Sequence, residues 1–352
     1  IYHRSDVYVN GVWLGHCSYG YTPLYYDLTP YIKFGLKNVI AVKVNTGGGT
    51  RWYAGGGIIR HVYLHTLNKL HVSHFGTFIK TTGLSENFAN IDVTTNINNS
   101  YSAPVQFTLQ TCIFNVDGNF VTRIKSNHSL LQNSRDEFNQ KIVLPNPELW
   151  DIYTPYLYFA ITEIILDNVT VDRYKTTFGI RTLEWNTQKG LLLNGRQIKV
   201  KGGNIHDALG MLGNAYNSRC WERRLGTLKN MGFNEIRASH NLRPREMMDL
   251  FDRMGFLLMD EAIDKWHHSE IYPDFDKNWE REISSMVYRD RNHPSVYLWS
   301  VGNEVDEQLS PNEFSKFYTM LSEWIHRNDP TRKVTCACQY NIQENLKIHD
   351  IT

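Results

Sequence analysis

The 352-residue sequence has no excess of charge of either sign, because 37 Lys and Arg balance 36 Asp and Glu to a formal net charge of +1. Proteins that bind nucleic acids or anionic membranes usually carry a surplus of positive charge. The sequence also lacks an apolar stretch long enough to span a bilayer. We therefore expect neither nucleic acid nor a membrane among the partners of this protein.

Cysteine is scarce as well. The five Cys residues are odd in number and scattered, and they form neither a CxxC pattern nor an obvious disulfide framework. We expect reduced, structural thiols. The chain opens on Ile1 with no initiator Met, basic region or apolar region, so no signal peptide is recognisable. The compartment, cytoplasmic or periplasmic, stays open.

Residues 1 to about 182 show the pattern of β structure, in which short alternating runs are separated by turn residues. Residues 6–9 (DVYV) form such a run, and Asn10-Gly11 after it is a hairpin signal. From about Lys69 a second set of short strands has the spacing of an immunoglobulin-like sandwich. We predict a first β domain over residues 1–67 and an immunoglobulin-like β-sandwich over residues 68–182.

The pattern changes near Leu183, after which strand-like and helix-like segments alternate. Such alternation is typical of a parallel sheet with helical crossovers. The expected strands are residues 197–203, 233–238, 256–260, 296–302 and 332–337. The expected helices are residues 221–231, 245–254, 278–290 and 311–327. We predict the first five βα units of a (β/α)₈ TIM barrel over residues 183–352, with a smaller open α/β sheet as the alternative.

A complete barrel has eight strands and typically about 250 residues. Only about 170 residues follow Leu183, and the first residues begin inside a β domain. The sequence is therefore interpreted as an internal fragment of a longer protein, lacking both ends.

Polar side chains follow four successive expected strands, at the point where each strand ends. In chain order they are His206 and Asp207, His240 and Asn241, Glu261 and Asp264, and Asn303 and Glu304. In a (β/α)₈ barrel these strand ends form the mouth where substrates bind. The recurrence over four strands predicts a polar site there.

Glu304 is the first candidate for chemistry, because a buried strand has no packing reason to end on Asn-Glu. The site residues suit glycoside hydrolysis, since His, Asn and Asp form directional hydrogen bonds with sugar hydroxyls. The reaction needs an acid for the departing oxygen and, in a retaining enzyme, a carboxylate nucleophile about 5–5.5 Å away. We expect Glu304 to be that acid, kept protonated by an apolar wall that Trp299 supplies. Asn303 is expected to bind a sugar hydroxyl.

Two other interpretations use the same residues. Glu304 could cap the following helix or lie in a solvated loop. His206 and His240 could bind zinc together with Glu261 or Asp264. However, each of these groups comes from a different strand, and no HxH or HExxH spacing supports a metal site.

At these residues the chain resembles glycoside hydrolase family 2, and within it the β-galactosidases, over essentially its whole length. The most specific match is residues 290–295 (DRNHPS) leading into Asn303-Glu304, which resembles the family's acid/base motif. Further matches are residues 178–181 (FGIR), 201–206 (KGGNIH), 231–234 (MGFN) and 237–241 (RASHN), at the barrel entry and its first two strands. Residues 6–11, 19–23, 51–53 and 57–60 resemble the sugar-binding jelly-roll domain.

The resemblance implies a multidomain β plus α/β protein: a partial jelly-roll β-sandwich over residues 1–67, the immunoglobulin-like sandwich and the N-terminal part of the barrel. It implies a retaining exo-β-glycosidase with Glu304 as general acid/base. The substrate-binding residues are then Asn303, His206, His240, Asn241 and Asp207. The family's nucleophile is a Glu at the end of the seventh strand, beyond these residues. We therefore expect the 352 residues alone not to hydrolyse a nitrophenyl β-glycoside.

Some family members bind Mg²⁺ through a Glu and a His just after the third strand. Here Lys265 stands where that Glu would be, and a positive charge is a poor neighbour for a divalent cation. We therefore predict no metal ligands and no cofactor, with Mg²⁺ or Na⁺ as the alternatives left open.

The expected partner is a carbohydrate substrate, and a homo-oligomer is left open for the whole protein. Galactose is the predicted sugar, with glucuronic acid or another sugar as alternatives, because residues 47–49 (GGG) replace residues that elsewhere reach the sugar. The rival from another class is a non-catalytic carbohydrate-binding protein, in which Glu304→Gln changes nothing.

Overall fold

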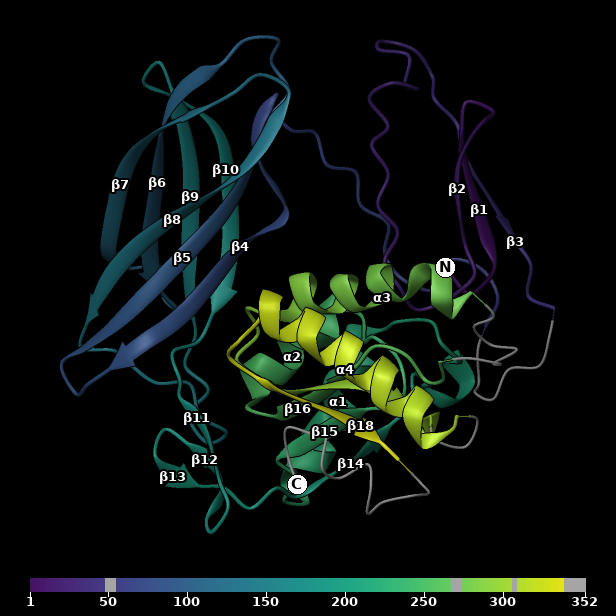
Figure 1. Ribbon diagram of the computed structural model, residues 1–352, viewed down its shortest axis with the longest axis vertical. Helices are drawn as coiled ribbons and strands as arrows, with labels where there is room; N and C mark the ends of the chain where they lie inside the picture. The colour runs from purple at the N-terminus through teal and green to yellow at the C-terminus, as the bar shows by residue number, and fades with distance from the viewer. Residues whose placement is uncertain (48–54, 267–273, 306–308, 339–352) are drawn as a thin grey trace.

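The computed structural model describes residues 1–47, 55–266, 274–305 and 309–338. Two β regions stand on one side of an α/β region, and a small sheet lies at the junction of the larger β region and the α/β region (Figure 1). The predicted order, β structure followed by α/β structure, is confirmed. None of the helices in the described ranges combines the length and hydrophobicity that crossing a bilayer requires.

The N-terminal region contributes a three-stranded antiparallel sheet of order β2-β1-β3. The strands are β1 (Ser5–Val9), β2 (Val12–Cys17) and β3 (Ile40–Val44). The turn between β1 and β2 is Asn10-Gly11, with φ of 49° and 86°. Positive φ at both central residues is what a tight hairpin turn needs, so the predicted turn is confirmed.

The second region is a sandwich of two antiparallel sheets, with strand orders β4-β5-β8 and β10-β9-β6-β7. Its strands are β4 (Leu70–Leu84), β5 (Phe88–Asn99), β6 (Val105–Asn115), β7 (Phe120–Leu130), β8 (Ser134–Pro145), β9 (Tyr158–Leu166) and β10 (Val169–Phe178). Buried residues alternate with exposed ones along β8 and with partly exposed ones along β6 and β9. The inward residues of both sheets form the core, as the immunoglobulin-like prediction requires.

A separate three-stranded sheet precedes the α/β region, and the sequence interpretation missed it. It consists of β11 (Leu183–Asn186), β12 (Gly190–Leu193) and β13 (Arg196–Gln197). The predicted strand over residues 197–203 is therefore wrong in its first half. The strand observed there is β14 (Gly202–Ile205). The apolar run of β12 packs against the N-terminal ends of the parallel strands instead of continuing the barrel pattern.

The α/β region has a five-stranded parallel sheet of order β14-β15-β16-β17-β18. The further strands are β15 (Glu235–Ala238), β16 (Leu257–Glu261), β17 (Val296–Asn303) and β18 (Lys333–Ala337). The helices are α1 (Ser218–Asn230), α2 (Arg245–Met254), α3 (Phe275–Asp290) and α4 (Pro311–Asn328), with a 3₁₀ turn at Gly210–Leu212. A doubly wound sheet reverses its strand order, whereas a barrel does not, so the uninterrupted order is that of a barrel.

The sandwich is anchored to the base of the α/β region through residues 290–295, which the sequence analysis treated as part of an acid/base motif. Asn292 exchanges hydrogen bonds with the backbone of β4, accepting from Ile79 N at 2.9 Å and donating to Thr77 O at 2.8 Å. The guanidinium of Arg181 donates to the carbonyl oxygens of Pro294 and Val296, both at 2.6 Å. This motif therefore holds two parts of the chain together, and it sets the start of β17, which carries Glu304 at its far end.

A buried carboxyl group at the N-terminal end of the parallel sheet makes folding stability depend on pH. Burial raises the pKa of Glu235 to about 7, while a hydrogen bond from Tyr297 and the charge of Arg237 oppose the rise. Gly202 leaves room for this side chain, since a Cβ there would lie 1.5 Å from Glu235 Oε2. The protonated form is thus favoured by folding. The stability that protonated Glu235 contributes is fully present below the ordinary pKa of 4.5, and it is lost as the pH rises through the folded-state pKa of about 7.

The variant Glu235→Gln keeps the shape and stays neutral at every pH. We expect it to be more stable than the parent chain by about 2–3 kcal/mol at pH 8, and by much less at pH 5. Urea unfolding followed by tryptophan fluorescence at both pH values measures this. The exposed Glu184→Gln variant serves as control and should show no such difference. An equal effect of Glu235→Gln at both pH values would contradict the assignment.

Candidate active site

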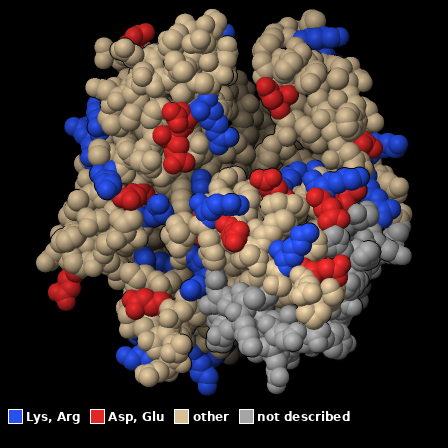
Figure 2. Space-filling view, in the orientation of Figure 1, with Lys and Arg blue, Asp and Glu red and all other residues tan. Residues whose placement is uncertain are grey.

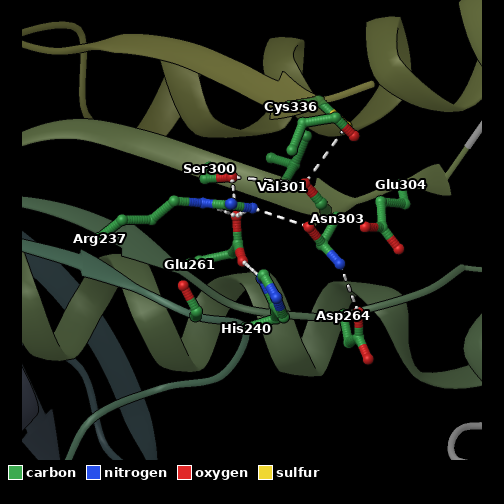
Figure 3. A network of polar contacts seen from close by, with 12 residues as sticks. Arg237, His240, Glu261, Asp264, Ser300, Val301, Asn303, Glu304 and Cys336 are labelled. Carbon is green, nitrogen blue, oxygen red and sulfur yellow. Dashed lines mark hydrogen bonds and ion pairs between the residues drawn. The ribbon is translucent and has the colours of Figure 1, made fainter. Parts of the chain in front are cut away.

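The four pairs of polar residues predicted from the strand ends do lie at one edge of the parallel sheet. His206 and Asp207 follow β14, His240 and Asn241 follow β15, and Asn303 closes β17. Because neighbouring parallel strands end at the same edge, residues from different strands come into contact there (Figure 3). Most of the set is buried, and Glu304 and His206 keep partial exposure. These two side chains are the most accessible to solvent in the set, and the others lie behind them.

Glu304 is held through its backbone and its side chain. Its φ is 49°, a left-handed conformation that few non-glycine residues adopt, and its N–H donates to Ala337 O at 2.7 Å. The ammonium of Lys265 donates to Glu304 O at 3.0 Å and to Glu304 Oε2 at 2.9 Å. The side chain of Lys265 is 5% exposed and that of Glu304 is 36% exposed. The ammonium thus lies on the protein side of a carboxyl group that still reaches solvent.

The expectation that Trp299 forms an apolar wall beside Glu304 is wrong. The indole N–H of Trp299 donates to Asp329 Oδ2 at 2.9 Å, and its ring packs among residues of the helices. Strict alternation would put Trp299 and Asn303 on one face of β17. However, the register with β18 shifts between Ser300 and Asn303, and this turns the last residue toward Arg237 instead.

Asn303 has both ends of its amide fixed. Its Oδ1 accepts from Arg237 Nη2 at 3.0 Å, and its Nδ2 donates to Asp264 Oδ1 at 3.0 Å. Its backbone N–H donates to Asp264 O at 2.8 Å. An amide has two donors and two acceptor positions, so one of each is left for a ligand after these bonds. The orientation of the amide is therefore set before any sugar arrives.

Glu261 is the centre of the buried part of the network (Figure 3). Its Oε2 accepts from Arg237 Nη2 at 2.8 Å and from Ser300 Oγ at 2.5 Å, and its Oε1 lies 2.7 Å from His240 Nδ1. Its side chain is completely buried. The carboxylate balances the Arg237 guanidinium and orients the His240 ring, so it acts as a support for the residues around it.

The two imidazoles lie against each other. The ring centroids of His206 and His240 are 5.2 Å apart, with the planes at 73°. Burial, followed by the influence of His240 and of two neighbouring guanidinium groups, lowers the pKa of His206 to about 4. His206 is therefore neutral at neutral pH. A neutral imidazole carries one donor and one acceptor nitrogen, which matches the two functions of a sugar hydroxyl.

The remaining two candidates, Asp207 and Asn241, are buried and bound by the N-terminal region. Arg60 Nη2 lies 2.8 Å from Asp207 Oδ2 and 2.6 Å from the carbonyl oxygen of Leu242. The hydroxyl of Tyr19 donates to Asn241 Oδ1. Residues about 150 to 220 positions earlier in the chain thus fix the ends of β14 and β15. The upper part of Figure 2 shows a groove between this region and the sandwich.

Sequence reasoning gave no role in the site to Arg237 or Tyr19, treated Glu261 only as a strand-end carboxylate and possible zinc ligand, and treated Lys265 only as a departure from a Mg²⁺ site. One signal was present for Lys265, which together with Asp264 interrupts an apolar stretch from Ala262 to Trp266. A lysine in such a stretch needs a partner when it is buried. No pattern in the sequence indicated that this partner is Glu304, 39 residues away.

The described residues directly after β16, residues 262–266, do not fit a divalent cation. An ammonium group contacts the Glu304 carboxylate where a metal ion would have to bind, and like charges repel. The zinc alternative does not fit either, since Glu261 accepts hydrogen bonds from Arg237 and Ser300. In the part of the chain that the structure describes, no three His, Cys, Asp or Glu side chains are grouped to hold a metal ion. The absence of a cofactor stays a prediction.

Part of the sequence argument lies outside the described residues. This applies to residues 51–53 of the jelly-roll match and to residues 48 and 49 of the glycine run.

Two family models match the chain. The model described as glycosyl hydrolases family 2, TIM barrel domain, matches residues 186–351. The model described as glycosyl hydrolases family 2 matches residues 70–181. Together they cover the sandwich and the α/β region, which contains all the candidate site residues.

Individual proteins agree with these matches. A beta-galactosidase of Bacteroides ovatus, BoGH2A, is 42% identical over 88% of this chain and 37% of its own length. A putative beta-glucuronidase of Formosa agariphila is 35% identical over 95% of this chain and 31% of its own length. The crystal structure of a glycosyl hydrolase family 2 member from Bacteroides cellulosilyticus superimposes with a TM-score of 0.94 at 35% identity, covering 99% of this chain and 48% of that one. The chain thus spans less than half the length of these relatives.

Proposed function

Because the chain belongs to glycosyl hydrolases family 2, we propose that it is part of a retaining exo-β-glycosidase that removes terminal β-linked galactose. The observation that carries this proposal is the position of Glu304. It is a partly exposed carboxyl group at the C-terminal edge of a parallel sheet, next to an oriented amide, and the helix that follows, α4, is capped by Ser310 instead. The relatives of greater length support the view that this chain works within a longer protein.

Glu304 acts twice in the proposed reaction. In the first step its proton goes to the glycosidic oxygen as the bond from that oxygen to the sugar carbon breaks. In the second step the resulting carboxylate takes a proton from water as the water attacks the glycosyl-enzyme intermediate. Glu261 is unsuited to be the nucleophile, because its carboxylate is completely buried and bound by Arg237, Ser300 and His240.

The substrate-binding roles follow from exposure and hydrogen-bonding capacity. We propose that His206 contacts sugar hydroxyls directly, since it is partly exposed and neutral. Asn303 offers its remaining donor and acceptor to the same sugar. The binding surface is completed by three residues behind His206 and Asn303, which are His240, Asn241 and Asp207. The contacts of the last two with Tyr19 and Arg60 make the N-terminal region a part of the site.

The domain boundaries also remain proposals: residues 1–67, 68–182 and 183–352. The first strand of the sandwich begins at Leu70 and the last ends at Phe178, which supports the first two. The sheet formed by β11 to β13 lies between sandwich and barrel, and we assign it to the barrel domain because its core includes Leu257 and Tyr297.

Galactose is preferred over glucuronic acid on electrostatic grounds. A glucuronide brings a carboxylate, which needs a cationic side chain in the pocket. The described cations at the strand ends are already paired: Lys265 with Glu304, Arg237 with Glu261 and Arg60 with Asp207. A neutral sugar does not require any of these pairs to break.

We therefore expect kcat/KM of the whole protein for 4-nitrophenyl β-galactoside to exceed that for the corresponding glucuronide by at least about 100-fold. The reason is that the glucuronide carboxylate would be buried without a cationic partner. Comparison of kcat/KM for the two substrates is the test. A preference for the glucuronide would overturn the choice of sugar but not the reaction. Failure to hydrolyse any β-glycoside would overturn the proposed function itself.

A further inference from the structure

Lys265 binds the candidate general acid/base through two contacts. One ammonium group binds two oxygen atoms of a single residue, the main-chain oxygen of Glu304 at 3.0 Å and its carboxylate Oε2 at 2.9 Å. The two atoms are separated by the whole length of the glutamate side chain. Holding both fixes the torsion angles between them, so the carboxyl group is left with a single position relative to the backbone.

The surroundings make this contact rigid. Lys265 lies in the connection after β16 and is 5% exposed, and a buried ammonium is stable only next to compensating oxygen atoms. Its neighbours Asp264 and Trp266 are both anchored to β17, by the Asn303 N–H bond to Asp264 O at 2.8 Å and by the Trp266 indole bond to Val301 O at 2.7 Å. The cation is therefore delivered to Glu304 from a backbone that is itself tied to the same strand.

We propose that Lys265 is the positioning residue of the general acid/base, a resident cation that fixes the Glu304 carboxyl group at the barrel mouth. The inference rests on the proposed function and adds to it. In this chain an amino acid side chain stabilises the carboxylate at a place where a divalent cation does not fit. Lys265 itself touches no substrate, because its ammonium lies behind the carboxyl group.

The proton balance of the reaction leaves Lys265 unchanged. It remains an ammonium in both steps, and the only proton that moves is the one that Glu304 gives to the leaving oxygen and later regains from water. Holding the carboxyl group of Glu304 in one position favours transfer of its proton to that oxygen. The same contact holds the carboxylate ready for the second step. Loss of the contact should therefore lower kcat/KM most for substrates whose leaving group must be protonated.

The test compares two substrates of the whole protein, an alkyl β-galactoside with a poor leaving group and 2,4-dinitrophenyl β-galactoside, whose leaving group needs no proton. We expect Lys265→Met to lower kcat/KM about 10- to 100-fold for the alkyl substrate and less than about 3-fold for the dinitrophenyl substrate. Lys265→Arg keeps the charge and should recover part of the loss. The double variant with Glu304→Gln should be no worse than Glu304→Gln alone, since both changes act through one carboxyl group.

Lys229→Met is the matched control. Lys229 is half-buried, whereas Lys265 is buried, but it also donates to two oxygens, the carbonyl groups of Ile152 and Gly255, and it lies at the end of α1 away from the C-terminal strand ends. Its replacement should change kcat/KM for both substrates by the same factor, because it acts only by lowering the stability of the protein. The inference is overturned if Lys265→Met lowers kcat/KM for both substrates by the same factor, or for neither, while the effect of Glu304→Gln still depends on the leaving group. If Glu304→Gln also loses that dependence, the proposed function fails instead.

Discussion

Replacing Glu304 with Gln is expected to lower kcat/KM of the whole protein for alkyl β-galactosides by about 10²–10⁴-fold, the range that a lost general acid produces. Gln has no proton to give to the departing oxygen. Its amide oxygen can still accept from Lys265, so the side chain keeps its place. For dinitrophenyl β-galactoside, whose leaving group departs unassisted, the loss should stay within about 10-fold in the glycosylation step. Steady-state kinetics on the two substrates provides the measurement.

A matched carboxylate outside the site gives the control. Glu313 forms the capping box of α4 with Ser310, and Gln can replace Glu in that motif. Glu313→Gln should leave the hydrolysis of both substrates unchanged. A Glu304→Gln variant as active as the parent on alkyl glycosides would favour the non-catalytic interpretation of the chain.

The second large effect is expected on stability. Glu261→Ala removes the one carboxylate that Arg237, Ser300 and His240 share and leaves a guanidinium in a mostly buried place without its partner. Breaking a buried pair on one side typically costs about 3–5 kcal/mol. We expect the free energy of unfolding of the α/β region to fall by that amount. Urea unfolding followed by the fluorescence of its buried tryptophans, among them Trp221 and Trp299, reports this region.

An exposed ion pair in the sandwich provides the control for Glu261→Ala. Glu163 pairs with Arg173 at 2.6 Å, but the Arg173 side chain is 66% exposed. Pairs of this kind contribute about 0–1 kcal/mol, so Glu163→Ala should change stability by no more than that. If the two variants lose equal stability, the view of Glu261 as the buried support of the site is wrong.

Much of the candidate site could be predicted because it depends on local pattern. Strands with polar endings predicted that His206, His240 and Asn303 share one edge of a sheet, and they do. Gly255 follows α2 with φ of 68°, the left-handed conformation that glycine commonly supplies after a helix. The boundaries of α2 were predicted to the residue, since apolar spacing and a following glycine both mark them.

The wrong expectation for Trp299 concerns the faces of β17. Regular alternation along β17 would put Trp299 on the same face as Asn303 and on the opposite face from Glu304, but the register with both neighbouring strands shifts along β17. A shift by one residue exchanges the two faces of a strand. Such shifts depend on how neighbouring strands fit together, which the sequence of one strand does not reveal.

By itself the sequence determined the order of β and α/β structure and the strand ends at which polar groups gather, because both follow from the periodicity of side chains along a single segment. Only the tertiary structure decided that the carboxyl group of Glu304 faces an ammonium instead of an indole, and that Tyr19 and Arg60 reach the ends of β14 and β15. These contacts join residues that are far apart in the chain. They depend on the packing of loops and domains, for which no local pattern exists.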